Sequence, residues 1–269
     1  NPNPKQFLEI IFGNVPKSEH GRLKAALASV LKPYLDPKMS VIHGLSGVGK
    51  STGLSIIAKL LGQYAMVTEL KKLLEDRATQ ANLKGKLFLV IQELPNTWKN
   101  LNQLKIMLGE QRFSGRKNFG DHDEWDNTIK AFSSANYLPA IPEEEQNSIH
   151  SRRLSLVHNT RIEQYPEDPT LEERIIENEG SKILSYLVNL MKEDYKYENK
   201  DTNQEEWEEI SNPEDEIIKN NYTYQIDATD IPIFHLIKSF KEEFKIKIAK
   251  ARLEEAFQKA GYNVYASQV

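Results

Sequence analysis

A glycine-rich stretch beginning at residue 44 carries residue types that bind phosphate. It fits G-x-x-x-x-G-K-[ST], the P-loop pattern, between a short apolar run and an amphipathic helical pattern. Glycines let backbone amides turn toward a phosphate, and the N-terminus of the following helix adds its dipole. A lysine can reach the β- and γ-phosphates, and a serine hydroxyl can ligate Mg²⁺. The pattern therefore predicts a site for ATP and Mg²⁺ at Gly44, Leu45, Ser46, Gly47, Val48, Gly49, Lys50, Ser51 and Thr52.

Two further apolar runs end in polar residues that suit the same chemistry. Glu93 ends the run LFLVIQEL, at the strand edge where parallel sheets bind ligands. A carboxylate there can activate water and help hold Mg²⁺, although the preceding residue is Gln92 where motor ATPases carry another acid. Asn136 ends TIKAFSSAN and is suited to polarising the attacking water or sensing the γ-phosphate. The alternatives are an ordinary strand-end glutamate and an asparagine that favours a turn.

Basic residues occur at two more places in this order. Arg152 and Arg153 precede the apolar run LSLV, and one of them could reach a neighbouring subunit's γ-phosphate. The alternative is a surface or salt-bridged pair. Arg112, Arg116 and Lys117 surround Gly115 in a stretch that suits a β-hairpin with a basic tip. Such a tip can grip nucleic-acid phosphates without regard to sequence, and the alternative is a solvated surface hairpin.

The elements that must position these residues follow from the hydrophobic pattern. Residues 1–38 form a predicted N-terminal helical segment, and residues 39–195 alternate apolar runs with helical patterns, which indicates an α/β core with a mainly parallel sheet. Residues 68–85 of that core are interpreted as a helix, and a further helical segment is expected at residues 181–197. Residues 196–228 form a predicted acidic linker, and residues 229–269 a small α+β module whose helix–helix–strand order suits a winged helix.

Charge is distributed unevenly along the 269 residues, whose net charge is −4. Residues 194–216 contribute ten acids and two lysines, so the rest of the chain is net positive. Cations of the C-terminal module favour either a duplex-DNA contact or a solvated helix face, among them Lys238, Lys241, Lys245, Lys247, Lys250 and Arg252. The overall acidity alone would argue against a nucleic-acid partner, whereas this distribution permits one.

Several classes of site and location are disfavoured by composition. The chain has no cysteine and no paired histidine spacing, which argues against disulfides and a protein-held zinc site. No apolar run approaches the ~20 residues that span a bilayer, and the first residues lack the features of a signal peptide. We expect a cytoplasmic location, in the host cell if the protein is viral or plasmid-borne. The opening without methionine predicts a segment of a longer polypeptide.

Taken in order, residues 5–195 resemble the superfamily 3 helicases, and most of all the poxvirus/phage-type primase-helicases, whose members also occur on archaeal plasmids and viruses. The matching pieces are GLSGVGKST (Walker A), LFLVIQELP (Walker B), KIMLGEQRFSGRKNFGD (motif B′), FSSANYLP (motif C) and SRRLSLV (arginine finger). The resemblance covers about 70% of the chain by this count of residues. It implies an AAA+-type ATPase core and a ring hexamer that moves single-stranded DNA through its central channel.

Carried over to this sequence, the resemblance assigns roles to individual residues. Lys50 and Ser51 match the Walker A pair, Glu93 the catalytic acid, and Asn136 the sensor. Arg153 best fits the finger, with Arg152 as its rival, and Lys117 leads the DNA contacts. A primase domain is expected before Asn1. The other hypotheses are a P-loop signalling or scaffold ATPase, which Gln92 and the acidity favour slightly, and a small-molecule kinase, which lacks an evident arginine-rich lid.

Overall fold

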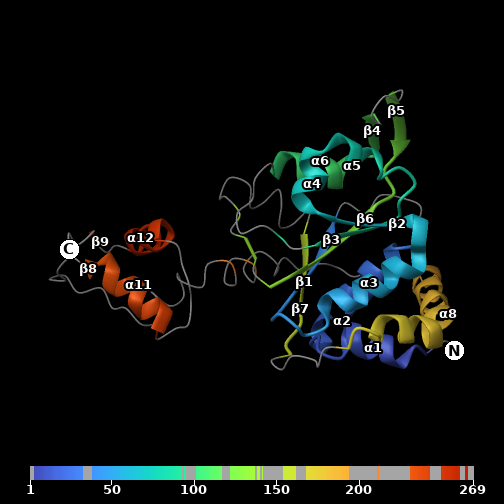
Figure 1. The fold of residues 1–269 in the computed structure, drawn as a ribbon, viewed down its shortest axis with the longest axis horizontal. Coiled ribbons are helices and arrows are strands. Elements are labelled where there is room, and N and C mark those ends of the chain that lie inside the picture. The colour runs from blue at the N-terminus through green and yellow to red at the C-terminus, as the bar shows by residue number, and fades with distance from the viewer. Residues whose placement is uncertain are drawn as a thin grey trace. The chain divides into compact units, whose positions relative to one another are not determined.

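The computed structural model divides into two units, Asn1–Trp207 and Glu208–Val269 (Figure 1). The structure describes residues 3–32, 38–92, 94, 101–116, 122–136, 138–139, 141, 154–161, 168–193, 207, 211, 231–242, 250–260 and 264–265.

A five-stranded parallel sheet forms the centre of the first unit. Its order is β2-β3-β6-β1-β7, and every neighbouring pair runs parallel. The strands are β1 (Met39–His43), β2 (Ala65–Glu69), β3 (Phe88–Gln92), β6 (Lys130–Ala135) and β7 (Leu154–His158). Burial of β1 and β3 on both faces explains their nearly continuous apolar sequences. The prediction of an α/β core with a mainly parallel sheet is confirmed.

The helices lie in two groups around this sheet (Figure 1). One group packs together and comprises α1 (Lys5–Phe12), α2 (His20–Ser29), α3 (Lys50–Leu61) and α8 (Leu171–Lys192). Its core includes Phe7, Leu23, Leu54, Ile183 and Leu187, all without solvent exposure. The N-terminal helices are therefore part of the packing around the P-loop helix α3. Two 3₁₀ turns, η1 (Lys17–Glu19) and η2 (Gly62–Tyr64), complete this region.

The second group stands beside a β-hairpin. It comprises α4 (Leu70–Glu75), α5 (Arg77–Ala81) and α6 (Leu101–Gly109), and the hairpin strands are β4 (Arg112–Arg116) and β5 (His122–Asp126). The two strands pair antiparallel, with Arg112 opposite Asp126 and Arg116 opposite His122. The β-hairpin expected in this stretch is thus present.

The interpretation of residues 68–85 as one helix is wrong. Its first residues belong to the edge strand β2, which pairs with β3, and the remainder is divided between α4 and α5. Asp76 causes the division, because its carboxylate accepts the backbone N–H groups of Ala78 and Thr79 and so begins a new helix. An edge strand buried on only part of its surface carries too little apolar pattern to be distinguished from a helix.

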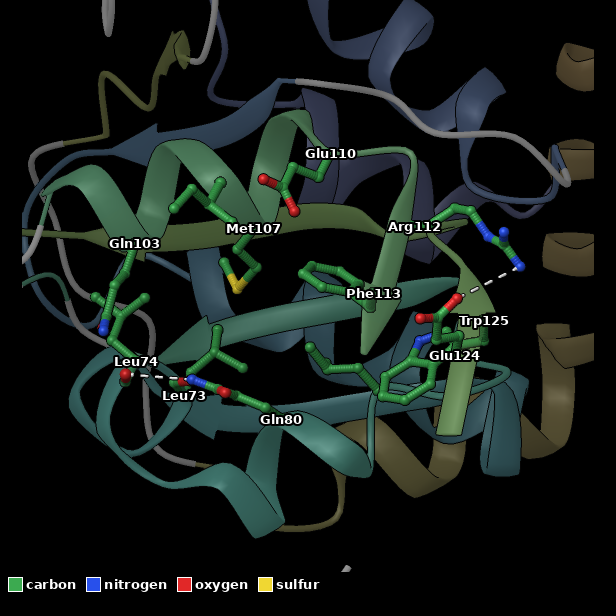
Figure 2. Close-up of a pocket in the computed structure, with 12 residues that line it drawn as sticks. Leu73, Leu74, Gln80, Gln103, Met107, Glu110, Arg112, Phe113, Glu124 and Trp125 are labelled. Atoms are coloured by element: carbon green, nitrogen blue, oxygen red, sulfur yellow. Dashed lines mark hydrogen bonds and ion pairs between the residues drawn. The ribbon is translucent and has the colours of Figure 1, made fainter. Parts of the chain in front are cut away.

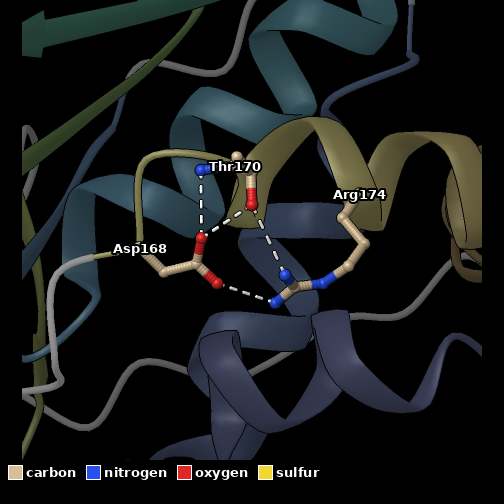
Figure 3. A network of polar contacts seen from close by, with 3 residues as sticks. All are labelled: Asp168, Thr170 and Arg174. Carbon is tan, nitrogen blue, oxygen red and sulfur yellow. Dashed lines mark hydrogen bonds and ion pairs between the residues drawn. The ribbon is translucent and has the colours of Figure 1, made fainter.

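Helix α8 begins at Leu171, well before the expected start at residue 181. Figure 3 shows why: the Asp168 carboxylate accepts from the Thr170 backbone N–H (3.0 Å), the Thr170 hydroxyl (2.8 Å) and Arg174 Nη2 (2.8 Å). The hydrogen bond from the Thr170 hydroxyl, followed by that from Arg174, holds the pKa of Asp168 below its usual value. This network fixes the first turn of a helix whose opening residues, LEERIIENE, are too charged to suggest a core element.

The second unit is a small α+β module. It contains α11 (Ile233–Glu242) and α12 (Lys250–Lys259), with β8 (Ile231–Pro232) pairing parallel to β9 (Val264–Tyr265). Leu236, Phe240, Leu253 and Phe257 are buried between the helices. Within the part of the chain that the structure describes, no helix combines the length and apolarity needed to cross a membrane.

Glu179 ties the long helix α8 to the start of α1. Its carboxylate accepts the backbone N–H groups of Gln6 (3.2 Å) and Phe7 (3.1 Å), and the residue is only 9% exposed. These donors belong to the first turn of α1, where a helix has no internal acceptor. A residue distant in sequence thus does the work of an N-cap.

We predict that Glu179→Ala lowers the free energy of unfolding by about 1–3 kcal/mol, because it leaves a buried backbone donor without an acceptor. Urea unfolding followed by circular dichroism measures this change. Glu177→Ala is the matched control, since Glu177 lies exposed on the same helix and is expected to change stability by less than about 0.5 kcal/mol. Equal effects of the two substitutions would contradict the capping role.

Candidate nucleotide site

The P-loop joins the carboxyl end of β1 to the first residue of α3. Gly47 (φ 76°) and Gly49 (φ 84°) adopt left-handed backbone conformations that favour glycine, and Gly49 immediately precedes the helix. Val48 between them is fully buried and anchors the loop. A cavity of about 470 Å³ opens over the loop and the ends of the neighbouring strands, lined by Ser46, Gly47, Val48, Gly49, Lys50, Ser51, Thr52, Leu94, Ser134, Ala135 and Asn136.

Asn159, which the sequence analysis missed, holds this loop from the side. Its backbone N–H donates to His43 O (2.7 Å), and its side-chain amide donates to Val48 O (3.4 Å). A Cβ at Gly44 would lie 2.6 Å from Asn159 O, so only glycine permits this approach. Asn159 directly follows β7, a neighbour of β1 in the sheet. A search for polar residues after every predicted strand would have found it.

Lys50 is buried in the cavity wall, and its ammonium group donates hydrogen bonds to three oxygen atoms. Nζ donates to Gly44 O (2.8 Å), Leu45 O (2.5 Å) and Asn136 Oδ1 (2.8 Å). Burial lowers the pKa of Lys50 below its ordinary value, because desolvation disfavours the charged form. Lys50 and Asn136, two of the residues that the sequence assigns to nucleotide chemistry, are therefore in direct contact.

Ser51 contacts a second residue of the strand that carries Asn136. Its Oγ lies 2.8 Å from Ser134 Oγ. Ser134 occupies the penultimate position of β6, two residues before Asn136, so the alternation of a strand places both on the same side. Ser134 is absent from the residues predicted for the site, because a serine within an apolar run is usually a neutral strand residue.

His43 is the last residue of β1 and directly precedes the P-loop. Its pKa is lowered to about 4, first by desolvation and then by electrostatic interaction with His158 and Lys50, whereas a hydrogen bond with the Asn136 backbone acts the other way. The rings of His43 and His158 meet edge to face at 5.9 Å. A neutral His43 adds no positive charge beside Lys50 at neutral pH.

Four of the predicted site residues lie outside the described residues: Glu93, Lys117, Arg152 and Arg153. The strands next to them are described. Strand β3 ends at Gln92 beside Ser134 of β6, at the carboxyl edge where the P-loop lies. Strand β7 begins at Leu154, and its parallel pairing with β1 puts that amino end at the opposite edge of the sheet.

Arg112 lies at the base of the β4–β5 hairpin (Figure 2). Its guanidinium is exposed and is 3.9 Å from Glu124 Oε2 and 3.7 Å from Asp126 Oδ1. Its charge is therefore partly balanced by acids within its own hairpin. Arg116 occupies the other end of β4, opposite His122.

A second cavity, of about 350 Å³, lies between that hairpin and helices α4, α5 and α6 (Figure 2). Its apolar lining includes Leu73, Met107 and Phe113. Trp125 also lines it, and the buried Trp125 Nε1 has no hydrogen-bond partner. Glu110 and Glu124 also line this cavity, so it carries carboxylates that are absent from the described lining of the P-loop cavity.

One family model matches a stretch of the first unit. Residues 42–153 match the model of a family described as a family of unknown function (DUF5906). A search of curated protein sequences finds no match to this chain.

Solved structures match most of the chain at the level of the fold. The A form apo structure of the NrS-1 C-terminal region superposes with a TM-score of 0.58 at 14% identity, over 94% of this chain and 69% of that one. A second structure of that region has a TM-score of 0.52 at 16% identity, with the same coverage. JCV helicase reaches 0.42 at 12% identity, over 89% of this chain and 64% of that one. The chain thus shares the fold of the NrS-1 C-terminal region.

We predict that His43 makes stability depend on pH between about 4 and its ordinary value near 6.5. In this window the unfolded chain binds a proton that the folded chain excludes, so the stabilisation is complete above pH 6.5 and is lost as the pH falls toward 4. Urea unfolding at pH 7 and pH 5 tests this in the wild type and in His43→Gln. The wild type should lose more stability on acidification, and equal losses would refute the assignment.

Proposed function

We propose that this chain is an ATP-dependent DNA helicase or translocase that acts in plasmid or viral DNA replication. It would be the helicase part of a longer primase-helicase. The observation that carries the proposal is the 2.8 Å contact between Lys50 Nζ and Asn136 Oδ1 across the P-loop cavity. It joins the phosphate-binding lysine to the strand-end amide that the motif order assigns to γ-phosphate sensing. The shared fold of the NrS-1 C-terminal region is consistent with this proposal.

ATP and Mg²⁺ suit the chemistry of the residues present. The P-loop amides and the Lys50 ammonium can bind phosphate oxygens. The exposed Ser51 hydroxyl at the cavity is a hard oxygen ligand of the kind that Mg²⁺ prefers. Bound Mg²⁺ would neutralise charge on the β- and γ-phosphates. Glu93, next after β3, would orient and deprotonate the attacking water, and Asn136 would hold that water or the γ-phosphate.

The arginines before β7 suit action on a neighbouring subunit. Arg153 is covalently joined to Leu154, the amino end of β7, whereas the P-loop cavity lies at the carboxyl edge of the same sheet. We propose on this ground that the arginine serves a neighbouring subunit rather than its own. In a ring hexamer, Arg153, or Arg152 in its place, would stabilise the transition state of the next subunit.

The β4–β5 hairpin would contact single-stranded DNA in the central channel. Arg112 is engaged by Glu124 and Asp126 at the hairpin base, so we assign the main phosphate contacts to Arg116 and Lys117 beyond it. The C-terminal module would touch duplex DNA through its lysines. Lys238 is exposed on α11, whereas Lys250 forms an ion pair with Glu254 at 3.8 Å. We expect the protein to act in the cytoplasm.

The other candidate is a P-loop signalling or scaffold ATPase whose nucleotide state controls assembly. Gln92 favours it, because this side chain supplies no charge at the end of β3 beside Ser134. Stimulation of hydrolysis by DNA separates the two proposals.

We expect Lys50→Ala to reduce ATP hydrolysis about a hundredfold or more, because it removes the cation that neutralises the phosphates. A steady-state phosphate-release assay measures the rate. Lys59→Ala is the matched control on the same helix: Lys59 is exposed, paired with Glu172 at 2.8 Å, and absent from the cavity lining. Comparable rates in Lys50→Ala and the wild type would refute the nucleotide site.

We expect single-stranded DNA to raise the hydrolysis rate, and Lys117→Ala to weaken both that stimulation and DNA binding. Fluorescence anisotropy of a labelled oligonucleotide, measured at several salt concentrations, gives the affinity, and the salt slope should decrease by about one for a lost phosphate contact. Lys72→Ala is the control, since Lys72 is an exposed lysine paired with Glu69 at 2.8 Å. Hydrolysis that DNA leaves unchanged would favour the scaffold ATPase.

A further inference from the structure

The hydroxyl groups of Ser51 and Ser134 form a pair at the edge of the P-loop cavity. Their oxygens lie 2.8 Å apart, and both residues line the cavity. Ser51 comes from the first turn of α3 and Ser134 from β6, 83 positions away in sequence. The pair therefore joins the phosphate-binding helix to the central sheet at the place where Mg²⁺ is expected.

A serine hydroxyl has one hydrogen to donate and two lone pairs to accept with. If Ser51 gives a lone pair to a cation, its hydrogen must point away from that cation toward another acceptor. Ser134 Oγ is that acceptor, at hydrogen-bond distance and on the sheet side of the pair. Donation from Ser51 to Ser134 leaves the Ser51 lone pairs free for the cavity.

The sheet holds Ser134 rigidly enough to orient its partner. Ser134 pairs in register with Ile42 of β1 on one side and with Gln92 of β3 on the other. The preceding residue, Ser133, is fully buried and donates its hydroxyl to Ile91 O at 2.9 Å. Both neighbouring strands therefore restrain the backbone of β6 at this point. A ligand orientated from such a strand loses little entropy when the cation binds.

We infer that Ser134 is a positioning residue for the Mg²⁺ that accompanies the nucleotide, because it orients the Ser51 hydroxyl from behind. This inference rests on the proposed nucleotide function and adds a residue to it. Outer partners that orient a metal ligand typically change metal affinity about 10–100-fold when removed. Ser134 acts only through Ser51, so its loss should affect Mg²⁺-dependent binding and leave Mg²⁺-independent binding of the nucleotide intact.

The test is an equilibrium titration of the purified chain with ADP carrying a fluorescent N-methylanthraniloyl group. Each protein is titrated in EDTA and in excess Mg²⁺, and the ratio of the two dissociation constants gives the gain in affinity from Mg²⁺. The proteins are the wild type, Ser134→Ala, Ser134→Thr and Ser55→Ala. Ser55 is the matched control, since it lies on α3, bonds Glu172 Oε2 at 2.7 Å, and is absent from the cavity lining.

The inference predicts that Ser134→Ala reduces the gain from Mg²⁺ about tenfold, with the constant in EDTA changed less than about twofold. Ser134→Thr, which keeps the hydroxyl, and Ser55→Ala should retain the wild-type gain. Three outcomes would overturn the role of Ser134. Ser134→Ala could keep the wild-type gain in affinity from Mg²⁺, or it could lose nucleotide affinity equally in EDTA and in Mg²⁺. Ser134→Thr could fail to retain the wild-type gain. If the wild type binds no nucleotide in either condition, the proposed function itself fails.

Discussion

The parallel pairing of β6 and β7 with β1 is the constraint on which the candidate site depends. Parallel strands bring their carboxyl ends to one edge, so residues distant in sequence meet at the P-loop. Asn136 and Ser134 reach Lys50 and Ser51 from one side, and Asn159 holds the loop from the other. A register shift of one residue in β6 would turn Ser134, and Asn136 just after the strand, to the opposite face of the sheet.

Lys50 illustrates how this edge is kept ready for a ligand. Its ammonium is buried, and three oxygen atoms compensate for its lost hydration. Phosphate oxygens can replace those acceptors, so the lysine need not be desolvated anew when an anion binds. The neutral state of His43 matters for the same reason, because a second charge at the end of β1 would raise the cost of keeping Lys50 protonated. The uncharged His43 thus helps to keep the buried Lys50 protonated.

The parts of the fold that the sequence predicts are those with a strong local signal. The P-loop pattern, the buried strands β1, β3 and β6, and the β4–β5 hairpin all have distinctive composition. Strand β2 and the start of α8 were missed because they depend on contacts beyond the segment itself, namely pairing with β3 and the Asp168 network. Ser134 and Asn159 were missed for a related reason. A serine or asparagine becomes informative only when the strand order brings it beside the P-loop.

The strand order also separates the residues next to the strands between the two edges of the sheet. Polar residues that follow a strand share the P-loop edge, whereas residues that precede one share the opposite edge. Within one chain, the described residues that line the P-loop cavity supply a lysine, hydroxyls and an amide. The candidate arginines, Arg152 and Arg153, lie outside the described residues and precede Leu154 in the sequence. No arginine is among the described residues that line the P-loop cavity, so under the proposed function a guanidinium would have to be supplied from outside this lining.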